Sequence, residues 1–495
     1  MNMERSSGIL MHISSLPSAC GIGTLGKAAY RYADFLKRAG QKYWQVLPIG
    51  PTGCGNSPYQ SFSTYAGNPY FIDLDMLAEE GLLSPNDYTN IDWGDDPARV
   101  DYGKIYENRF NVLRKAFENG SWRDAEAVGQ FLQDKSGWIH DYALFMALKN
   151  HLGMLPWNKW PDEGAKLGTA EAREKFGTLL RYDVEFWIYI QYLFYKQWYA
   201  LKQYVNALGI RIIGDVPIYV AQDSSDIWAN PGIFWLDAER NPVCVAGCPP
   251  DYFSATGQLW GNPLYDWASL KKSGYQWWMQ RIAALREIFD VIRIDHFRGF
   301  EAFYAIPRGE ETAQNGTWIQ GPGIDFFNAL RQEMGEVPII AEDLGFLTPE
   351  VRRLLDDTGY PGMKVLQFAF DSREPSDYLP HNYNRNCVVY TGTHDNDTGA
   401  GWFTSVRPED AELAKEYLRL TSEEGYSWGL VRGALSSVAD LAVAQMQDFL
   451  ELPGEARMNI PSTLGGRNWQ WRMAESALTD ALAERIGHMT RLYGR

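Results

Sequence analysis

The sequence of 495 residues contains few cysteines and no long apolar run, and each absence excludes a class of protein. Its five cysteines are odd in number and widely spread, which does not fit a disulfide framework, so we expect free thiols. Cys244 and Cys248 have no pair of histidines nearby and do not resemble a zinc knuckle. No stretch of about 18 apolar residues occurs, which argues against a membrane-spanning helix. The first residues contain no apolar stretch before a small-residue cleavage site, so we predict a cytoplasmic protein.

Positive charge is also scarce, since 46 Lys and Arg stand against 62 Asp and Glu and the formal net charge is −16. An acidic protein is a poor partner for nucleic acid or an anionic membrane, and we expect neither. A neutral ligand remains compatible with this charge. The 19 Trp and 28 Tyr are many for this length, and they fit either a large core or surfaces that stack on sugar rings.

Short runs rich in Val and Ile alternate with segments typical of helices, such as Val184–Leu208, which Gly209 follows. This alternation predicts an α/β fold with a parallel sheet that is covered on both faces. Seven strands are clear, and we expect an eighth near Arg457–Ile460, so the prediction is a (β/α)8 TIM barrel. The seven clear strands are Gly8–Ile13, Tyr43–Leu47, Ile210–Val216, Val291–Ile294, Val337–Ala341, Lys364–Phe370 and Cys387–Thr391.

The predicted strands are unevenly spaced, and no Pro/Gly/Ser-rich linker or internal repeat divides the chain. We therefore expect one catalytic barrel over residues 1–495 with large, mainly helical insertions. The first insertion is predicted at residues 75–205. The second is predicted at residues 225–285, and its loop 247–258 would lie over the opening of the barrel.

Gly21-Ile-Gly-Thr-Leu-Gly26 matches a dinucleotide-binding fingerprint. That fingerprint needs an acidic residue about 20 positions later, and residues 41–60 contain no Asp or Glu. We therefore do not expect a nucleotide cofactor.

Three acidic motifs follow three of the predicted strands, at Asp295, at Glu342-Asp343 and at Asp395. The carboxyl ends of barrel strands surround one opening, so these carboxylates are expected to converge. Like charges repel, so a cluster of carboxylates destabilises the folded protein. Such a cluster therefore indicates that the carboxylates have a function. Retaining cleavage of a glycosidic bond needs one carboxylate as nucleophile and a second carboxyl group as acid and then base. A third carboxylate can bind sugar hydroxyls.

Arg293, two residues before Asp295, is expected on the same face of the strand, where its charge would keep Asp295 ionised. The acidic neighbours of Glu342 predict a raised pKa for its carboxyl group. Asp215, which follows another strand, can also bind hydroxyls. Each acid taken alone also fits a helix cap or an ion pair, and Asp343 fits a cap particularly well.

His296 and His394 flank two of the acids, which leaves a metal site as an alternative. No two histidines have the spacing of a helical metal site, and we expect no metal. The segment Ser57–Tyr70 is polar, aromatic and interrupted by prolines, so it is predicted to be a loop. Such a loop either contacts the ligand at the barrel mouth or forms an ordinary surface turn.

These stretches together resemble the amylomaltases, or 4-α-glucanotransferases, over essentially the whole chain. The resemblance rests on Ser57–Tyr70, Pro249–Pro263, the three acidic motifs, Glu455–Pro461 and Asn468–Arg472. It implies an α-amylase-like barrel that transfers a segment of an α-1,4-glucan to the 4-hydroxyl of an acceptor glucose or malto-oligosaccharide, without a cofactor. It also implies that Asp295 is the nucleophile, Glu342 the acid/base and Asp395 the transition-state stabiliser.

The resemblance further implies a set of substrate-binding residues, and places Tyr252 and Phe253 at the tip of a loop over the cleft. That set is Ser57, Tyr59, Asp215, Tyr252, Phe253, Gln258, Trp260, Arg293, His296, Asp343, His394 and Asn468. A covering loop would disfavour water at the intermediate. Two other functions stay open, a plain α-glucan hydrolase on the same barrel and a non-catalytic glucan-binding protein. The sequence carries no signal of the oligomeric state.

Overall fold

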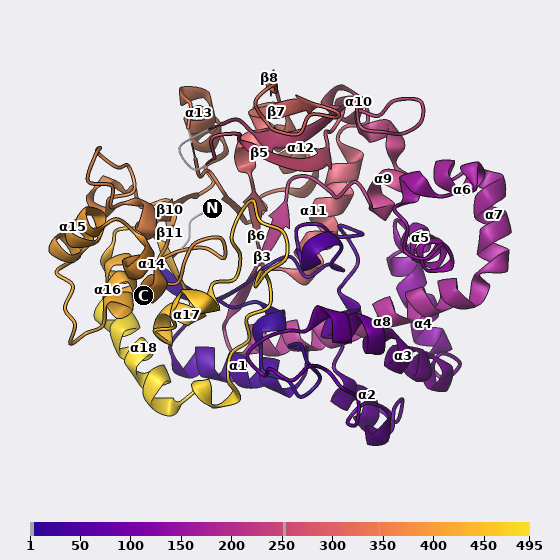
Figure 1. The fold of residues 1–495 in the computed structure, drawn as a ribbon, viewed down its shortest axis with the longest axis horizontal. Helices are drawn as coiled ribbons and strands as arrows, with labels where there is room; N and C mark the ends of the chain where they lie inside the picture. The colour runs from indigo at the N-terminus through magenta and orange to yellow at the C-terminus, as the bar shows by residue number, and fades with distance from the viewer. Residues whose placement is uncertain (1–3, 251–253, 346) are drawn as a thin grey trace.

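A barrel of eight parallel strands forms the centre of the computed structural model, which describes residues 4–250, 254–345 and 347–495 (Figure 1). The strands follow the order β10-β11-β12-β1-β2-β3-β6-β9 around the barrel. Their bounds are β1 Ser6–Leu10, β2 Tyr43–Val46, β3 Arg211–Pro217, β6 Val291–Asp295, β9 Ile339–Ala341, β10 Gly362–Val365, β11 Cys387–Tyr390 and β12 Leu441–Gln445.

The first and last strands of that order meet through two hydrogen bonds. The amide of Ala341 donates to the carbonyl of Pro361 over 3.0 Å, and the amide of Met363 donates to the Asp343 carboxylate over 2.6 Å. These contacts join β9 to β10 and close the barrel. The predicted (β/α)8 fold is confirmed.

The predicted position of the eighth strand is wrong. The strand is β12, which pairs with β1 on one side and with β11 on the other, whereas Arg457–Ile460 belongs to no strand. All five side chains of β12 are buried, and two of them are alanines that fit a crowded barrel wall. Alanine has a low strand propensity, so the sequence pattern of this run does not predict a strand.

Helices surround the barrel and fill the long connections between its strands (Figure 1). Between β2 and β3 lie α2 Leu74–Glu79, α3 Tyr102–Gly120, α4 Ala125–Asp134, α5 Ile139–His151, α6 Glu163–Leu167, α7 Ala170–Leu179 and α8 Arg181–Ala207. The other helices are α1 Lys27–Arg38, α9 Ser225–Ala229, α10 Trp267–Lys272, α11 Gln276–Ile288, α12 Ile324–Met334, α13 Pro349–Thr358, α14 Gly399–Ser405, α15 Pro408–Leu418, α16 Tyr426–Ser436, α17 Met446–Phe449 and α18 Asp480–Leu492.

A second, antiparallel sheet has the strand order β5-β4-β7-β8 and was not predicted. Its strands are β4 Cys244–Cys248, β5 Gln258–Pro263, β7 Ala302–Pro307 and β8 Thr317–Gln320. Two of them precede β6 in the sequence and two follow it, so this sheet extends beyond residues 225–285. The division of the chain into inserted subdomains stays a prediction.

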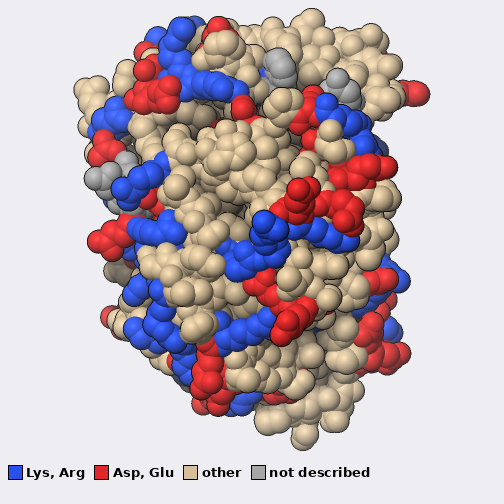
Figure 2. Space-filling model, turned by 90° about the vertical axis from the view of Figure 1, so that its left-hand side faces the viewer, with Lys and Arg blue, Asp and Glu red and all other residues tan. Residues whose placement is uncertain are grey.

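Much of the aromatic content lies in the core. Tryptophans that are almost completely buried include Trp44, Trp157, Trp187, Trp198, Trp228, Trp278 and Trp428. On the face drawn in Figure 2, acidic and basic side chains are interspersed between large uncharged areas. Across the described ranges, no helix has both the length and the apolar character required to cross a bilayer.

Candidate active site

Arg293, on β6, lies between two carboxylates at the carboxyl end of the barrel. Its Nη1 donates to Asp215 Oδ1 over 2.6 Å and to Asp295 Oδ1 over 3.0 Å. The Asp215 side chain is fully buried, whereas the Asp295 side chain is 33% exposed. Burial lowers the pKa of Arg293, but Asp215 and Asp295 outweigh it and raise that pKa well above its ordinary value. A permanent positive charge therefore faces both carboxylates, and only Asp295 is open to a ligand.

A continuous chain of contacts leads from Asp215 to Asp395 through Tyr59 and His394. The Tyr59 hydroxyl donates to Asp215 Oδ2 over 2.9 Å, and its oxygen lies 3.4 Å from His394 Nδ1. The Tyr59 and His394 rings stack with centroids 5.0 Å apart, and the other ring nitrogen of His394 lies 3.4 Å from Asp395 Oδ1. Trp469 packs 5.8 Å from each of these two rings. The sequence predicted the members of this chain, except Trp469, but not their order.

Glu342, after β9, contacts the residue that follows Asp295. The amide of His296 donates to Glu342 Oε2 over 2.6 Å, and the amide of Leu344 donates to Oε1 over 2.8 Å. His296 itself adopts a left-handed backbone conformation with φ 57°, which is uncommon outside glycine and costs conformational energy. Burial, and next the charge of Asp295, raise the pKa of Glu342 to about 8. Glu342 is therefore mostly protonated at neutral pH. The sequence predicted a raised pKa from the acidic neighbours, but burial has the larger effect.

Asp395 is held by the segment that was predicted to be the eighth strand. Asn459 Nδ2 donates to Asp395 Oδ1 over 2.6 Å, and the Asn459 amide donates to the His394 carbonyl over 3.0 Å. The Arg457 side chain hydrogen-bonds the carbonyl of Asp395 and, through Nε, that of Asn459. This stretch carries part of the family resemblance, but the sequence predicts no role for Arg457 and Asn459, because the contacts of both with Asp395 span more than 60 residues.

His296 and Trp260 lie edge to face on another side of the cluster. Their ring centroids are 4.7 Å apart with an interplanar angle of 88°, and Nε1 of Trp260 donates to Gln258 Oε1 over 3.1 Å. Burial lowers the pKa of His296 to about 4, so its imidazole is neutral at pH 7. Among the residues that the structure describes, the buried His296 Nε2 atom has no hydrogen-bond partner. A neutral, unpaired ring nitrogen beside an aromatic face fits the recognition of a sugar hydroxyl.

Three of the remaining predicted residues, Asp343, Ser57 and Asn468, have contacts within the protein. Asp343 accepts from the Met363 amide at the barrel closure, and burial raises its pKa. Ser57 Oγ accepts from the Tyr59 amide over 3.3 Å. Asn468 spans its own loop, because Oδ1 accepts from the Ile460 amide and Nδ2 donates to Thr463. Tyr252 and Phe253 lie outside the described residues, and all five binding roles stay predictions.

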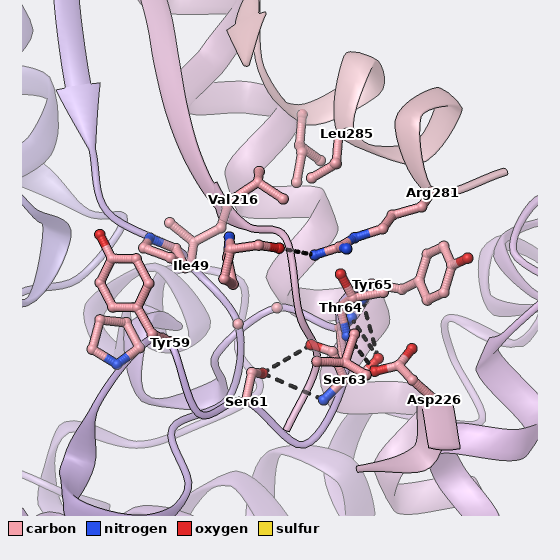
Figure 3. Close-up of a pocket in the computed structure, with 18 of the residues that line it drawn as sticks. Ile49, Tyr59, Ser61, Ser63, Thr64, Tyr65, Val216, Asp226, Arg281 and Leu285 are labelled. Atoms are coloured by element: carbon pink, nitrogen blue, oxygen red, sulfur yellow. Dashed lines mark hydrogen bonds between the residues drawn. The ribbon is translucent and has the colours of Figure 1, made fainter. Parts of the chain in front are cut away.

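A buried cavity of about 50 Å³ adjoins the cluster through Tyr59 and Asp215. Figure 3 shows Tyr59 at one side of it and Arg281 and Asp226 at the other. Asp226 Oδ2 accepts from the Thr64 amide over 2.8 Å, and burial raises the Asp226 pKa to about 7. The volume suits a few water molecules, at roughly 10–15 Å³ each, rather than a sugar. Asp295, Glu342 and Asp395 do not line this cavity.

The cluster combines one carboxylate beside a fixed cation with one carboxyl group that holds its proton. Within the described part of the chain, no group of three or more His, Cys, Asp or Glu side chains is arranged to hold a metal ion. The arrangement can supply a nucleophile and a proton donor, which is the pair that glycosyl transfer uses.

Comparison with known proteins gives one consistent result. A family model described as 4-alpha-glucanotransferase matches residues 11–479. The 4-alpha-glucanotransferase of Clostridium butyricum is 53% identical over 98% of this chain and 100% of its own length. That of Streptococcus pneumoniae is 50% identical over 99% of this chain and 98% of its own. The solved structure of amylomaltase from Streptococcus agalactiae in complex with acarbose has a TM-score of 0.97 and 42% identity, and covers 99% of this chain and 100% of its own.

Proposed function

Because this chain belongs to the 4-alpha-glucanotransferase family, we propose that its carboxylate cluster moves a segment of an α-1,4-glucan to the 4-hydroxyl of an acceptor by a retaining double displacement. The family model and the relatives confirm the family and the activity that the sequence predicts. The residue roles, the glucose acceptor, the use of maltodextrins and the order of steps are the proposal. The observation that carries it is the contrast between Asp295, paired with Arg293, and Glu342, whose pKa is about 8.

In the first step a carboxylate oxygen of Asp295 attacks the anomeric carbon of the donor sugar. The bond from that carbon to the leaving oxygen breaks, and Glu342 gives its proton to this oxygen. The product is a glycosyl ester on Asp295 with inverted configuration, a departed sugar and a Glu342 carboxylate. The Arg293 guanidinium lies 3.0 Å from the attacking Asp295 side chain, and Asp395 would contact the hydroxyls of the distorted ring.

In the second step the 4-hydroxyl of an acceptor attacks the same carbon, and Glu342 takes the hydroxyl proton. The ester bond breaks, Asp295 leaves as a carboxylate, and the second inversion restores the α-linkage. Both steps balance in protons and electrons with the two carboxyl groups alone, so the proposal includes no cofactor. His296, Trp260 and Tyr59 would hold the sugar ring beside these groups.

Incubation of the pure protein with maltotriose, followed by chromatography over time, tests this function. We expect glucose together with a ladder of longer malto-oligosaccharides. Glucose and maltose without longer chains would identify a hydrolase, the competing function on the same site. Unchanged maltotriose would remove the catalytic assignment and favour a glucan-binding protein. The cytoplasmic location stays a prediction, which cell fractionation can check.

Replacement of Tyr59 by Phe tests the contact chain between Asp215 and His394. The change removes the hydroxyl that donates to Asp215 Oδ2 and leaves that buried oxygen without this donor. A buried acceptor left without its donor costs about 1–3 kcal/mol, so we expect kcat/KM for maltotriose to fall by about 5- to 150-fold. The matched variant Tyr182→Phe removes an exposed hydroxyl that donates to Glu118, and it should keep the wild-type value. Equal rates for the two variants would contradict a role for Tyr59.

A further inference from the structure

We propose that Asp448 is a positioning residue of the transfer reaction, which fixes the segment Thr391–Gly399 so that His394 and Asp395 face the Asp215–Asp295 side of the barrel. The inference rests on the proposed function for the role of Asp395. Asp448 itself lies in α17, directly after β12, and is completely buried. It belongs to none of the contacts described for the active site.

Asp448 holds both ends of that segment with its two carboxylate oxygens. Oδ2 accepts from the Thr391 hydroxyl over 2.5 Å, directly after β11, and Oδ1 accepts from the Gly399 amide over 2.6 Å, at the start of α14. The approach is close, because a Cβ atom at Gly399 would lie 2.6 Å from Ser427 Oγ and 3.2 Å from Asp448 Oδ1. One side chain thus sets the separation of the two points between which His394 and Asp395 lie.

Two glutamine amides hold the same segment two residues before its end. Gln367 Nε2 and Gln445 Nε2 donate to the carbonyl of Asp397 over 2.8 and 3.2 Å. Gln367 follows β10 and Gln445 ends β12, so the strands on both sides of β11 contribute. A Cβ atom at Gly392 would lie within 2.9 Å of both amide nitrogens, which requires glycine-like space there. The segment is therefore held at three points by residues that do not reach the site themselves.

This support matters because the Asp395 side chain is 43% exposed, and Asn459 is the residue that donates to its carboxylate. Its position therefore depends on the backbone that carries it. A displacement of about 1 Å in a group that acts in the transition state can cost about 100-fold in rate. Burial, the largest influence, raises the pKa of Asp448 to about 6, so its carboxylate predominates at pH 7 and can accept both hydrogen bonds.

The test compares Asp448→Ala with Asp448→Asn in the disproportionation of maltotriose at pH 7. The alanine variant loses both acceptors, and we expect kcat to fall by about 30-fold or more while KM stays within about 3-fold. The asparagine variant has the same shape, can accept from Gly399 and can donate to the Thr391 hydroxyl oxygen. We expect it to retain kcat within about 5-fold. The melting temperature of each variant is measured, and kcat is calculated per mole of folded protein.

Asp410 offers a matched control, because it is also buried and accepts from one backbone amide, that of Ser372, over 2.8 Å. Asp410→Ala should lower the melting temperature and leave kcat unchanged. If Asp448→Ala fails to fold, Gln445→Met removes one donor to Asp397 and is expected to lower kcat by about 5-fold at unchanged KM. Wild-type kcat in Asp448→Ala or Gln445→Met, or a change in KM alone, would overturn the inference. Wild-type protein that makes no longer oligosaccharides would instead refute the proposed function.

Discussion

Replacement of Asp295 by Asn is expected to lower kcat for maltotriose disproportionation by about 10⁴-fold or more, with little change in substrate binding. The amide has almost the shape of the carboxylate but is a poor nucleophile, so no glycosyl ester can form. Arg293 would keep Asp215 as a partner, since that pair is closer than the pair with Asp295. The variant should therefore fold normally, and binding of maltotriose can be measured by calorimetry in the absence of turnover.

Asp183 provides the matched control for this experiment. Its side chain is 33% exposed and lies 2.9 Å from Arg114, whereas Asp295 is 33% exposed and lies 3.0 Å from Arg293. Asp183→Asn makes the same carboxylate-to-amide change at the start of α8, in an ion pair with α3, and should retain the wild-type rate. The covalent mechanism is wrong if Asp295→Asn keeps more than a few per cent of wild-type kcat.

The convergence of the three carboxylates that we propose as catalytic was predictable from the topology of the barrel. Asp295 ends β6, Glu342 and Asp395 come after β9 and β11, and the carboxyl ends of parallel barrel strands surround one opening. Arg293 was predictable for the same reason, since residues two apart on a strand share a face. In each case a local pattern and one rule about the fold were sufficient.

The contacts between these residues were not predictable. Asn459 donates to Asp395, and Asp448 holds Thr391 and Gly399, through loops whose course no local pattern specifies. The eighth strand was misplaced for a related reason. The alanines of β12 are poor strand formers and are suited to that position only by the strands on either side, β1 and β11.

Glu342→Gln is expected to separate the two halves of the reaction. Glutamine cannot give a proton to the leaving oxygen, so kcat for maltotriose should fall by about 10²- to 10⁴-fold. With a donor such as α-glucosyl fluoride, the leaving fluoride needs no proton. The variant should therefore be slowed far less in the first step with this donor. Release of fluoride by the variant, followed in time, checks this difference. An equal loss on both donors would mean that Glu342 is not the proton donor.

The titration of Glu342 is expected to determine how kcat/KM falls at basic pH. Glu342 acts in the first step as an acid, and its pKa is raised to about 8, so the protonated form predominates below that pH. As pH rises through 8 this form is lost, and kcat/KM of the wild-type enzyme for maltotriose should decline about tenfold per pH unit. The decline should be absent in Glu342→Gln and also for α-glucosyl fluoride in the wild type. A basic limb that persists in Glu342→Gln would assign the titration to another group. His296 would not account for it, because burial lowers the His296 pKa to about 4.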